Sequence, residues 1–441
     1  MISLRVVIPA VVTAGVLIAA GVLVLGRDGD AEPARERLVR AATTPGPTVL
    51  VDARGTVLAE FTGECGSGRY AYVCERVRTE LEANAPELLT GKPGLTVRTA
   101  IDPRAQEAAQ QAVDRYVGRA DEHLALEAMV VPGSGEIRAL AASHDELRGY
   151  KGFQQGSTAM VYTLAAALEG GLRIGDGFPF AASYRAPTYA AFKNCKGQNV
   201  GDPTHSVLNF ERGGGGFTTL ESGTLARQNT FFVQLTERVG LCESVRMAQR
   251  LGLERADGLR LQEFETFALG VNEVDPVAVA TTYATLAARG LHCAPRVVTE
   301  VSDRSGYRRS FPPRCEQAVE APVADAVTGV LERALAKGPL KGLGRDAAGM
   351  DGTMDSNVSA TYAGYTPALA AAVALGHPDG YRRPLTGVTI GGKRYAEVEG
   401  TTIPGPIWKD SMKAALDGTG ATSFAPPDTT RFGGCSRACA D

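Results

Sequence analysis

The longest apolar stretch of the chain lies close to its N-terminus. Residues 6 to 25 read VVIPAVVTAGVLIAAGVLVL, which contains no charged residue, and about 20 apolar residues suffice to cross a bilayer. Arg5 precedes the run and mostly acidic charges follow it, so the positive-inside rule favours a cytoplasmic N-terminus. No small-x-small cleavage site is clear after the run, which favours a signal anchor over a cleaved signal peptide. We therefore expect a single-pass protein of the cytoplasmic membrane, with residues 27 to 441 outside the cytoplasm.

Beyond this run, the hydrophobic pattern changes between the period of strands and the period of helices. Strand-like segments joined by turn residues predict hairpins at 48–61, 126–142 and 359–375, and two-residue alternation predicts a strand at 94–101. Amphipathic segments predict helices at 72–89, 102–117, 157–169, 219–227, 230–239, 243–251, 276–289, 322–336 and 406–416. This order of strands, helices and further strands predicts an α+β fold in which helices cover an antiparallel sheet.

Composition and charge exclude some classes of function. With 441 residues, 44% hydrophobic content and a formal charge of -3, the chain has the composition of a globular protein and no basic excess for nucleic acid. The tetraglycine at 213–216 lacks the Lys-Ser/Thr that follows in a phosphate-binding loop. We expect neither a nucleic-acid partner nor a cofactor.

Cysteines lie along most of the extracytoplasmic part, where disulfides persist. Eight cysteines allow about 105 pairings, but their order suggests four local bridges, of which the last is the least secure because it lies close to the chain end. The suggested bridges are Cys65–Cys74, Cys195–Cys242, Cys293–Cys315 and Cys435–Cys439. Without a C-x-x-C pair, and with five scattered histidines, no zinc or other metal site is expected.

The segment GSTAMVYTLAAALEGG, at 156–171, has the composition of an active-site helix. Residues one turn apart share a helix face, so position 160 lies beside the Ser157 hydroxyl. Serine acyl-enzymes of the S-x-x-K type have a lysine there, which takes the serine proton. This chain has Met160, and its thioether is no useful proton acceptor.

Four segments resemble, in the same order, the transpeptidase domain of class A penicillin-binding proteins, most closely the actinobacterial kind. They read GLTVRTAIDPRAQEAA, FQQGSTAMVYTLAAALEGG, TLARQNTFFVQLTERVGLC and AAGMDGTMDSNVSATYAGYTPALAAAVALGHPDG. The resemblance covers residues 94–425 and implies the family fold, a five-stranded antiparallel sheet with helices on both faces.

The same resemblance organises the rest of the chain. TVLVDARGTVLAEF and YVCERVRTELEANAPELLTGKPGLTVRT resemble the beginning and the end of the family's glycosyltransferase domain, yet only residues 62 to 71 separate them. A complete glycosyltransferase domain is therefore not expected. We predict an anchor at 1–26, a linker and remnant segment at 27–93, the transpeptidase-like domain at 94–425 and a cysteine-containing tail at 426–441.

The family's reaction implies roles for particular positions. Its first-motif serine attacks a D-alanine carbonyl of the stem peptide, the S-x-N motif moves protons and holds the substrate, and the K-T-G-T strand binds the substrate carboxylate. The positions that keep the family's residues are Ser157, Asn229, Gly352 and Thr353. The positions that depart from it are Met160 (lysine in the family), Arg227 (serine), Met350 (lysine) and Asp351 (threonine).

These departures lead to the functional hypothesis. A positioned general base contributes about 10²–10⁴ in rate, and losing one member of a cooperating set can cost about 10⁶. We expect a pseudoenzyme of peptidoglycan biosynthesis that acts as a scaffold, as a regulator of cell-wall synthases or as a binder of stem peptides or β-lactams. The alternative is an active serine acyl-enzyme that uses Ser157 with a non-standard base. A β-lactam or muropeptide sensor is a third possibility, which the five residues before the predicted anchor do not favour.

Purely structural roles remain open for the same residues. Ser157 and Asn229 could each cap a helix, and Met160 and Met350 could fill gaps in the core. Arg227 and Asp351 are expected to face each other across the cleft as an ion pair, the alternative being two separately solvated charges. A separation beyond about 6 Å between their charged groups would contradict the pair.

Overall fold

The computed structural model describes residues 47–62, 65, 67–90, 94–147, 150–210, 216–378, 380, 383–437 and 439. These residues belong to one compact unit that runs from Gly46 to Asp441. The predicted anchor at 6–25 lies outside the described residues. Within the described part, no helix combines the length and the apolar composition that crossing a bilayer requires.

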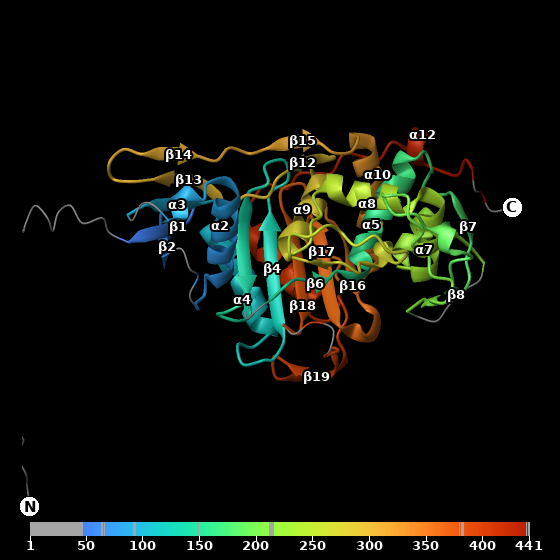
Figure 1. The fold of residues 1–441 in the computed structure, drawn as a ribbon, viewed down its shortest axis with the longest axis horizontal. Helices are drawn as coiled ribbons and strands as arrows, with labels where there is room; N and C mark the ends of the chain where they lie inside the picture. The colour runs from blue at the N-terminus through green and yellow to red at the C-terminus, as the bar shows by residue number, and fades with distance from the viewer. Residues whose placement is uncertain are drawn as a thin grey trace, which may run out of the picture. The chain divides into compact units, whose positions relative to one another are not determined.

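A five-stranded antiparallel sheet forms the centre of this unit (Figure 1). The strands, in spatial order, are β16 (Ala348–Thr353), β17 (Ser359–Tyr365), β18 (Ala370–Gly376), β4 (Leu124–Val130) and β5 (Ile137–Ala142). The hairpins predicted at 126–142 and 359–375 are confirmed as β4–β5 and β17–β18. The strand β16 is an edge of the sheet, a position that decides the geometry of the candidate site.

Helices cover both faces of this sheet. Every residue of β4, β17 and β18 is buried, which explains why these strands are almost continuously apolar rather than alternating. Alternate strand residues join two separate cores: Ala125 and Met129 pack with one helix layer, while Leu126 and Ala128 pack with the other. The first layer contains α4 (Pro103–Tyr116) and α11 (Pro404–Ala415), and the second contains α9 (Pro276–Ala287) and α10 (Ala321–Lys337).

A group of shorter helices extends the second layer away from the sheet (Figure 1). They are α5 (Met160–Glu169), α6 (Leu220–Leu225), α7 (Asn229–Val239) and α8 (Leu241–Leu251). Each begins and ends within a few residues of its predicted bounds. The predicted cap of α4 is also confirmed, because the Asp102 carboxylate accepts hydrogen bonds from the backbone N–H groups of Arg104 and Ala105.

A second five-stranded sheet contacts α2 (Ala71–Asn84) and includes residues from both sides of the predicted domain boundary. Its spatial order is β14 (Arg308–Ser310), β13 (Val298–Ser302), β3 (Thr96–Thr99), β1 (Thr48–Val51) and β2 (Val57–Phe61). The predicted hairpin at 48–61 and the strand at 94–101 are confirmed, and β1 pairs in parallel with β3. The boundary at residue 94 stays a prediction.

The segment 72–89 differs from its prediction as a single helix. It divides into α2 (Ala71–Asn84) and α3 (Glu87–Thr90). Pro86 explains the break, because proline cannot donate to the helix ladder and disfavours helical backbone at the preceding residue, Ala85. Ala85 accordingly has φ -161° and ψ 55°.

Short ribbons and single turns connect these elements. The ribbons are β6 (Phe153–Gln154) with β11 (Glu273–Val274), β7 (Gly177–Pro179) with β10 (Phe217–Thr219), β8 (Ser183–Tyr184) with β9 (Val207–Leu208), β12 (Leu291–Cys293) with β15 (Cys315–Gln317), and β19 (Thr386–Ile390) with β20 (Lys393–Glu397). The turns are η1 (Gly156–Ala159), η2 (Tyr189–Ala191), η3 (Phe267–Leu269), η4 (Asp355–Asn357) and the short helix α12 (Thr429–Phe432).

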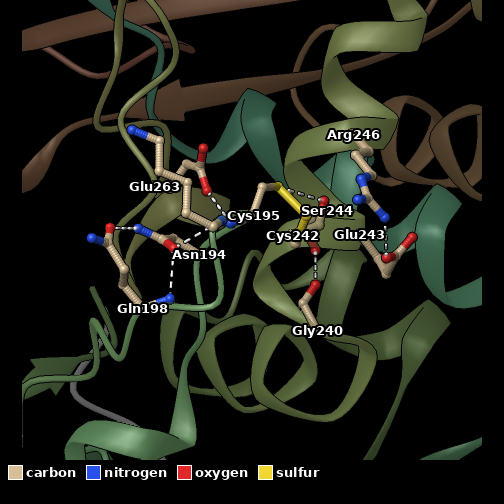
Figure 2. Close-up of a disulfide and its surroundings, with 10 residues drawn as sticks. Asn194, Cys195, Gln198, Gly240, Cys242, Glu243, Ser244, Arg246 and Glu263 are labelled. Carbon is tan, nitrogen blue, oxygen red and sulfur yellow. Dashed lines mark hydrogen bonds and ion pairs between the residues drawn. A yellow bond between two sulfur atoms is a disulfide. The ribbon is translucent and has the colours of Figure 1, made fainter.

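All four local disulfides that the cysteine order suggested are present. Figure 2 shows the bridge between Cys195 and Cys242, which fastens a long loop to the beginning of α8. The Glu263 carboxylate accepts a hydrogen bond from the Cys195 backbone N–H. The disulfide and this hydrogen bond together hold three segments that are distant in the sequence.

Glu127 is a buried carboxyl group in the middle of the central sheet. Its side chain contacts the Ser411 hydroxyl on α11 through one oxygen, while the other oxygen has no polar partner among the described residues. Burial raises the pKa of Glu127 well above its usual range, because a charge inside the core loses its hydration. The folded chain therefore keeps this proton at a pH at which the unfolded chain has released it.

We expect Glu127→Gln to raise the free energy of unfolding more at pH 8 than at pH 5. A raised folded-state pKa gives stability that is complete below the unfolded pKa and is lost as pH rises, by up to about 1.4 kcal/mol per pH unit. Urea unfolding of both proteins at the two pH values measures this. The exposed Glu60→Gln is the matched control, with an expected change within about 0.5 kcal/mol. An equal effect of Glu127→Gln at both pH values would contradict the prediction.

Candidate active site

Ser157 lies in the turn η1, where that turn contacts the edge strand β16. A Cβ atom added at Gly156, whose φ is +61°, would lie 2.7 Å from the Thr353 nitrogen. A Cβ atom added at Gly352 would lie 2.2 Å from the Gln155 carbonyl oxygen. These are backbone contacts that only glycine permits, so two glycines bring the serine beside the strand.

Neither Ser157 nor Asn229 caps a helix, so that interpretation of both residues is wrong. The N-cap of α5 is Ala159, and Ser157 lies inside the preceding turn, where its side chain makes no capping hydrogen bond. Asn229 is already the first residue of α7, because the extended N-cap position belongs to Gln228. The Asn229 side-chain amide instead donates to the Leu208 carbonyl oxygen at 3.0 Å.

Met160 is completely buried one turn after Ser157 and packs in the larger core. Near it, the Tyr162 hydroxyl donates to the Gln155 side chain at 3.1 Å, and the Tyr283 hydroxyl donates to the Thr158 carbonyl oxygen at 3.0 Å. Burial raises the pKa of both tyrosines. Their phenols therefore stay protonated and do not replace the missing lysine as a base.

Arg227 and Asp351 form the predicted ion pair. The distance between Arg227 Nη1 and Asp351 Oδ1 is 3.2 Å. Arg227 follows α6 with φ +49°, a conformation that is uncommon for a residue with a side chain, and Asp351 belongs to β16. Burial raises the pKa of Asp351, and the nearby Arg227 guanidinium opposes that rise. The ion pair thus joins the loop of the S-x-N motif to β16, the strand that carries the K-T-G-T motif positions.

Five of the sequence-predicted positions surround one small cleft of about 100 Å³. They are Ser157, Arg227, Asn229, Asp351 and Thr353. Met350 lines a separate hollow of about 130 Å³, and Arg227 and Asp351 line this hollow as well. The ion pair therefore divides the space, and each part is smaller than the roughly 300–1,000 Å³ of typical small-molecule sites.

The cleft also contains residues that the sequence reasoning missed. Asp355 and Glu399 add two carboxyl groups to that of Asp351, and Arg227 is the only cationic side chain among the described lining residues. Burial raises the pKa of Asp355. Asp355 follows the third motif closely and could have been proposed from the sequence, whereas Glu399 comes from a distant loop without a motif of its own.

The loop that contains Glu399 is hydrogen-bonded to β16. The Thr353 hydroxyl accepts a hydrogen bond from the Gly400 backbone N–H at 3.1 Å. The Thr353 hydroxyl, which keeps the residue of the family motif, thus also holds the loop against β16. Lys151, a basic residue six positions before Ser157, is exposed and is not among the residues that line the cleft.

A serine in the turn that precedes a buried helix, held against the edge of a five-stranded antiparallel sheet with helices on both faces, is the arrangement expected of the penicillin-binding-protein fold. The comparisons with known proteins agree. Penicillin-binding protein 1A of Mycobacterium tuberculosis is 30% identical over 372 residues, covering 80% of this chain and 43% of the relative. The protein of the same name from Mycolicibacterium smegmatis is 29% identical, covering 77% and 44%.

A solved structure is similar over most of the chain. PonA1 from M. tuberculosis in complex with penicillin V has a TM-score of 0.68 and 26% identity, covering 84% of this chain and 100% of that chain. No family model matches. The chain belongs to the penicillin-binding proteins and contains a class A-like transpeptidase domain. It spans less than half the length of the curated relatives that it matches.

Proposed function

We propose that this protein serves peptidoglycan biosynthesis without catalysing transpeptidation, as a scaffold or regulator of cell-wall synthases. In this proposal an N-terminal anchor holds it in the cytoplasmic membrane, with the bulk of the chain outside the cytoplasm. The observation that carries the proposal is the ion pair between Arg227 and Asp351, which lies in the wall of the same small cleft as Ser157. The apolar run at 6–25 supports the anchor.

The chemistry of the cleft supports a loss of acyl transfer. Ser157 needs a neighbour that accepts its proton, and the described lining residues include no amine or imidazole. A guanidinium group such as that of Arg227 donates hydrogen bonds and accepts none, so it offers no acceptor for the serine proton. A missing general base alone removes about 10²–10⁴ in rate, before any loss of substrate binding is counted.

The shape and charge of the cleft support a scaffold more than a stem-peptide binder. Stem peptides and β-lactams present a carboxylate to this part of the fold, whereas three carboxyl groups and one guanidinium line the cleft here. Like charges in a poorly hydrated site repel each other. A ligand of either kind would also have to displace the ion pair, because the free space of about 100 Å³ is too small.

The alternative function is an active serine acyl-enzyme, of the D,D-transpeptidase or carboxypeptidase type, with a non-standard base. One observation favours it: Ser157 is retained, lines the cleft and makes no side-chain hydrogen bond in the described part of the chain. A carboxylate of the cleft would then have to act as the base.

Covalent labelling with a fluorescent penicillin separates the two functions. We expect the full-length chain, in membranes, to show no label that survives a denaturing gel. PonA1, which has been solved with penicillin V, is the positive control, and Ser157→Ala is the matched negative variant. Stable labelling that disappears in Ser157→Ala would overturn the proposal. Recovery of the chain in the soluble rather than the membrane fraction would contradict the anchor.

A further inference from the structure

A second, larger cavity lies at the end of α5 that is remote from Ser157. Its volume is about 510 Å³, within the range of small-molecule sites. None of its lining residues lines the cleft of the candidate active site. The apolar part of its wall is formed by Ala166, Ala167, Leu172, Phe178, Leu220 and Val239.

The acidic residues of this cavity already have polar partners. Glu169 pairs with Arg250, and Glu243 pairs with Arg246 at 3.0 Å, the latter drawn in Figure 2. Asp176 is fully buried, and its carboxylate accepts hydrogen bonds from three backbone N–H groups, two of which belong to the C-terminal tail at Ser436 and Arg437. Two of the three acids in the wall are therefore paired with a cation, and the carboxylate of the third, Asp176, is held by hydrogen bonds that point it toward the tail.

The cavity wall also contains two arginines, Arg238 and Arg437. The Arg238 guanidinium lies over the Phe178 ring, 4.2 Å from its centroid, and the Arg437 side chain donates to the Gly170 carbonyl oxygen at 3.3 Å. Neither has a carboxylate partner among the described residues. Their planar donor groups suit a carboxylate or a similar oxyanion.

Rigid elements hold this arrangement together. The bridge between Cys195 and Cys242 fixes the beginning of α8 next to Glu243 (Figure 2). On the other side, the tail is fastened by the Asp176 carboxylate and by backbone bonds from Ile174 to Phe432 and from Gly175 to Gly434. An apolar wall, two arginines without a carboxylate partner among the described residues and a rigid frame therefore occur together in this cavity.

We propose that this cavity, lined by Arg238 and Arg437, binds a small amphipathic anion with an apolar body and a carboxylate or sulfonate group. The apolar body packs on Ala166, Leu172 and Val239, and the anionic group lies between the two guanidinium groups. The site is independent of the proposed function, because it involves neither Ser157 nor the ion pair of the cleft.

Binding is tested with 8-anilinonaphthalene-1-sulfonate, whose fluorescence rises in apolar sites, and with octanoate as its competitor. We expect saturable binding of the dye to the full-length chain and displacement by octanoate. From butyrate to octanoate, affinity should rise about fourfold for each methylene group buried. Octyltrimethylammonium, which has the same apolar chain and the opposite charge, should not displace the dye.

Substitutions test the two cations. Arg238→Gln and Arg437→Gln are each expected to weaken octanoate binding about tenfold or more, as the loss of a charge-assisted hydrogen bond predicts. Arg308→Gln is the matched control, because it makes the same change of charge at a 70% exposed side chain on β14, and it should leave binding unchanged. Equal affinities of all three variants, or displacement by the cationic amphiphile, would overturn the proposal.

Discussion

Restoring the four departed motif positions together is expected to create a chain that a fluorescent penicillin labels covalently at Ser157. The variant combines Met160→Lys, Arg227→Ser, Met350→Lys and Asp351→Thr. It provides a base beside the serine, removes the ion pair that divides the cleft and returns a cation to the edge strand. Since these groups act as a unit, we expect a gain of at least about 10³ in the rate of labelling.

The single variant Met160→Lys is the decisive comparison. It supplies the amine, but Arg227 and Asp351 still cross the cleft, so a penicillin does not reach Ser157. We expect no label above that of the unmodified chain. Adding Ser157→Ala to the fourfold variant should abolish its label, and thermal melting of each variant checks the fold. Efficient labelling of the single variant would show that the ion pair does not close the site.

Gly352→Ala is expected to lower the free energy of unfolding by about 2–3 kcal/mol. The added Cβ atom would lie 2.2 Å from the Gln155 carbonyl oxygen and 3.0 Å from the Ser157 and Thr158 nitrogens. All three neighbours are backbone atoms, so no side chain can move aside. The turn η1 and the strand β16 must separate, and urea unfolding measures the cost.

Gly420→Ala provides the control for this substitution. A Cβ atom at Gly420 meets no heavy atom within 4 Å, and the residue has no positive φ. The same chemical change should therefore alter stability by less than about 0.5 kcal/mol. Equal losses in the two variants would mean that the glycine at position 352 is not required by the contact between the turn and the strand.

The four motif departures make physical sense as a set. Methionine at positions 160 and 350 replaces two cations of the family pattern by apolar side chains, which are 0% and 3% exposed here. Arg227 and Asp351 then introduce one cation and one anion that satisfy each other at 3.2 Å. A buried charge without a partner is costly, so a change at one of these two positions favours a complementary change at the other.

The sequence by itself determined most of the elements and the family, and the order of the cysteines suggested the four disulfides. Apolar runs on either side of turn residues placed the hairpins β4–β5 and β17–β18, and helical periodicity placed the helices around them, because both signals are local properties of the chain. Four motif segments in order identified the transpeptidase domain. The same motifs placed Arg227 and Asp351 opposite each other, since each occupies a family position whose neighbours across the cleft are set by the fold.

Only the tertiary structure decided what depends on contacts between distant segments. It joined β1, β3 and β13 into a second sheet, added Asp355 and Glu399 to the cleft, and brought the C-terminal Arg437 into the wall of the same cavity as Arg238. It also showed that Ser157 and Asn229 do not cap helices, because the turn η1 begins earlier and Gln228 takes the extended position before α7. These features depend on packing between segments that are distant in the sequence. Local pattern and propensity contain no information about that packing.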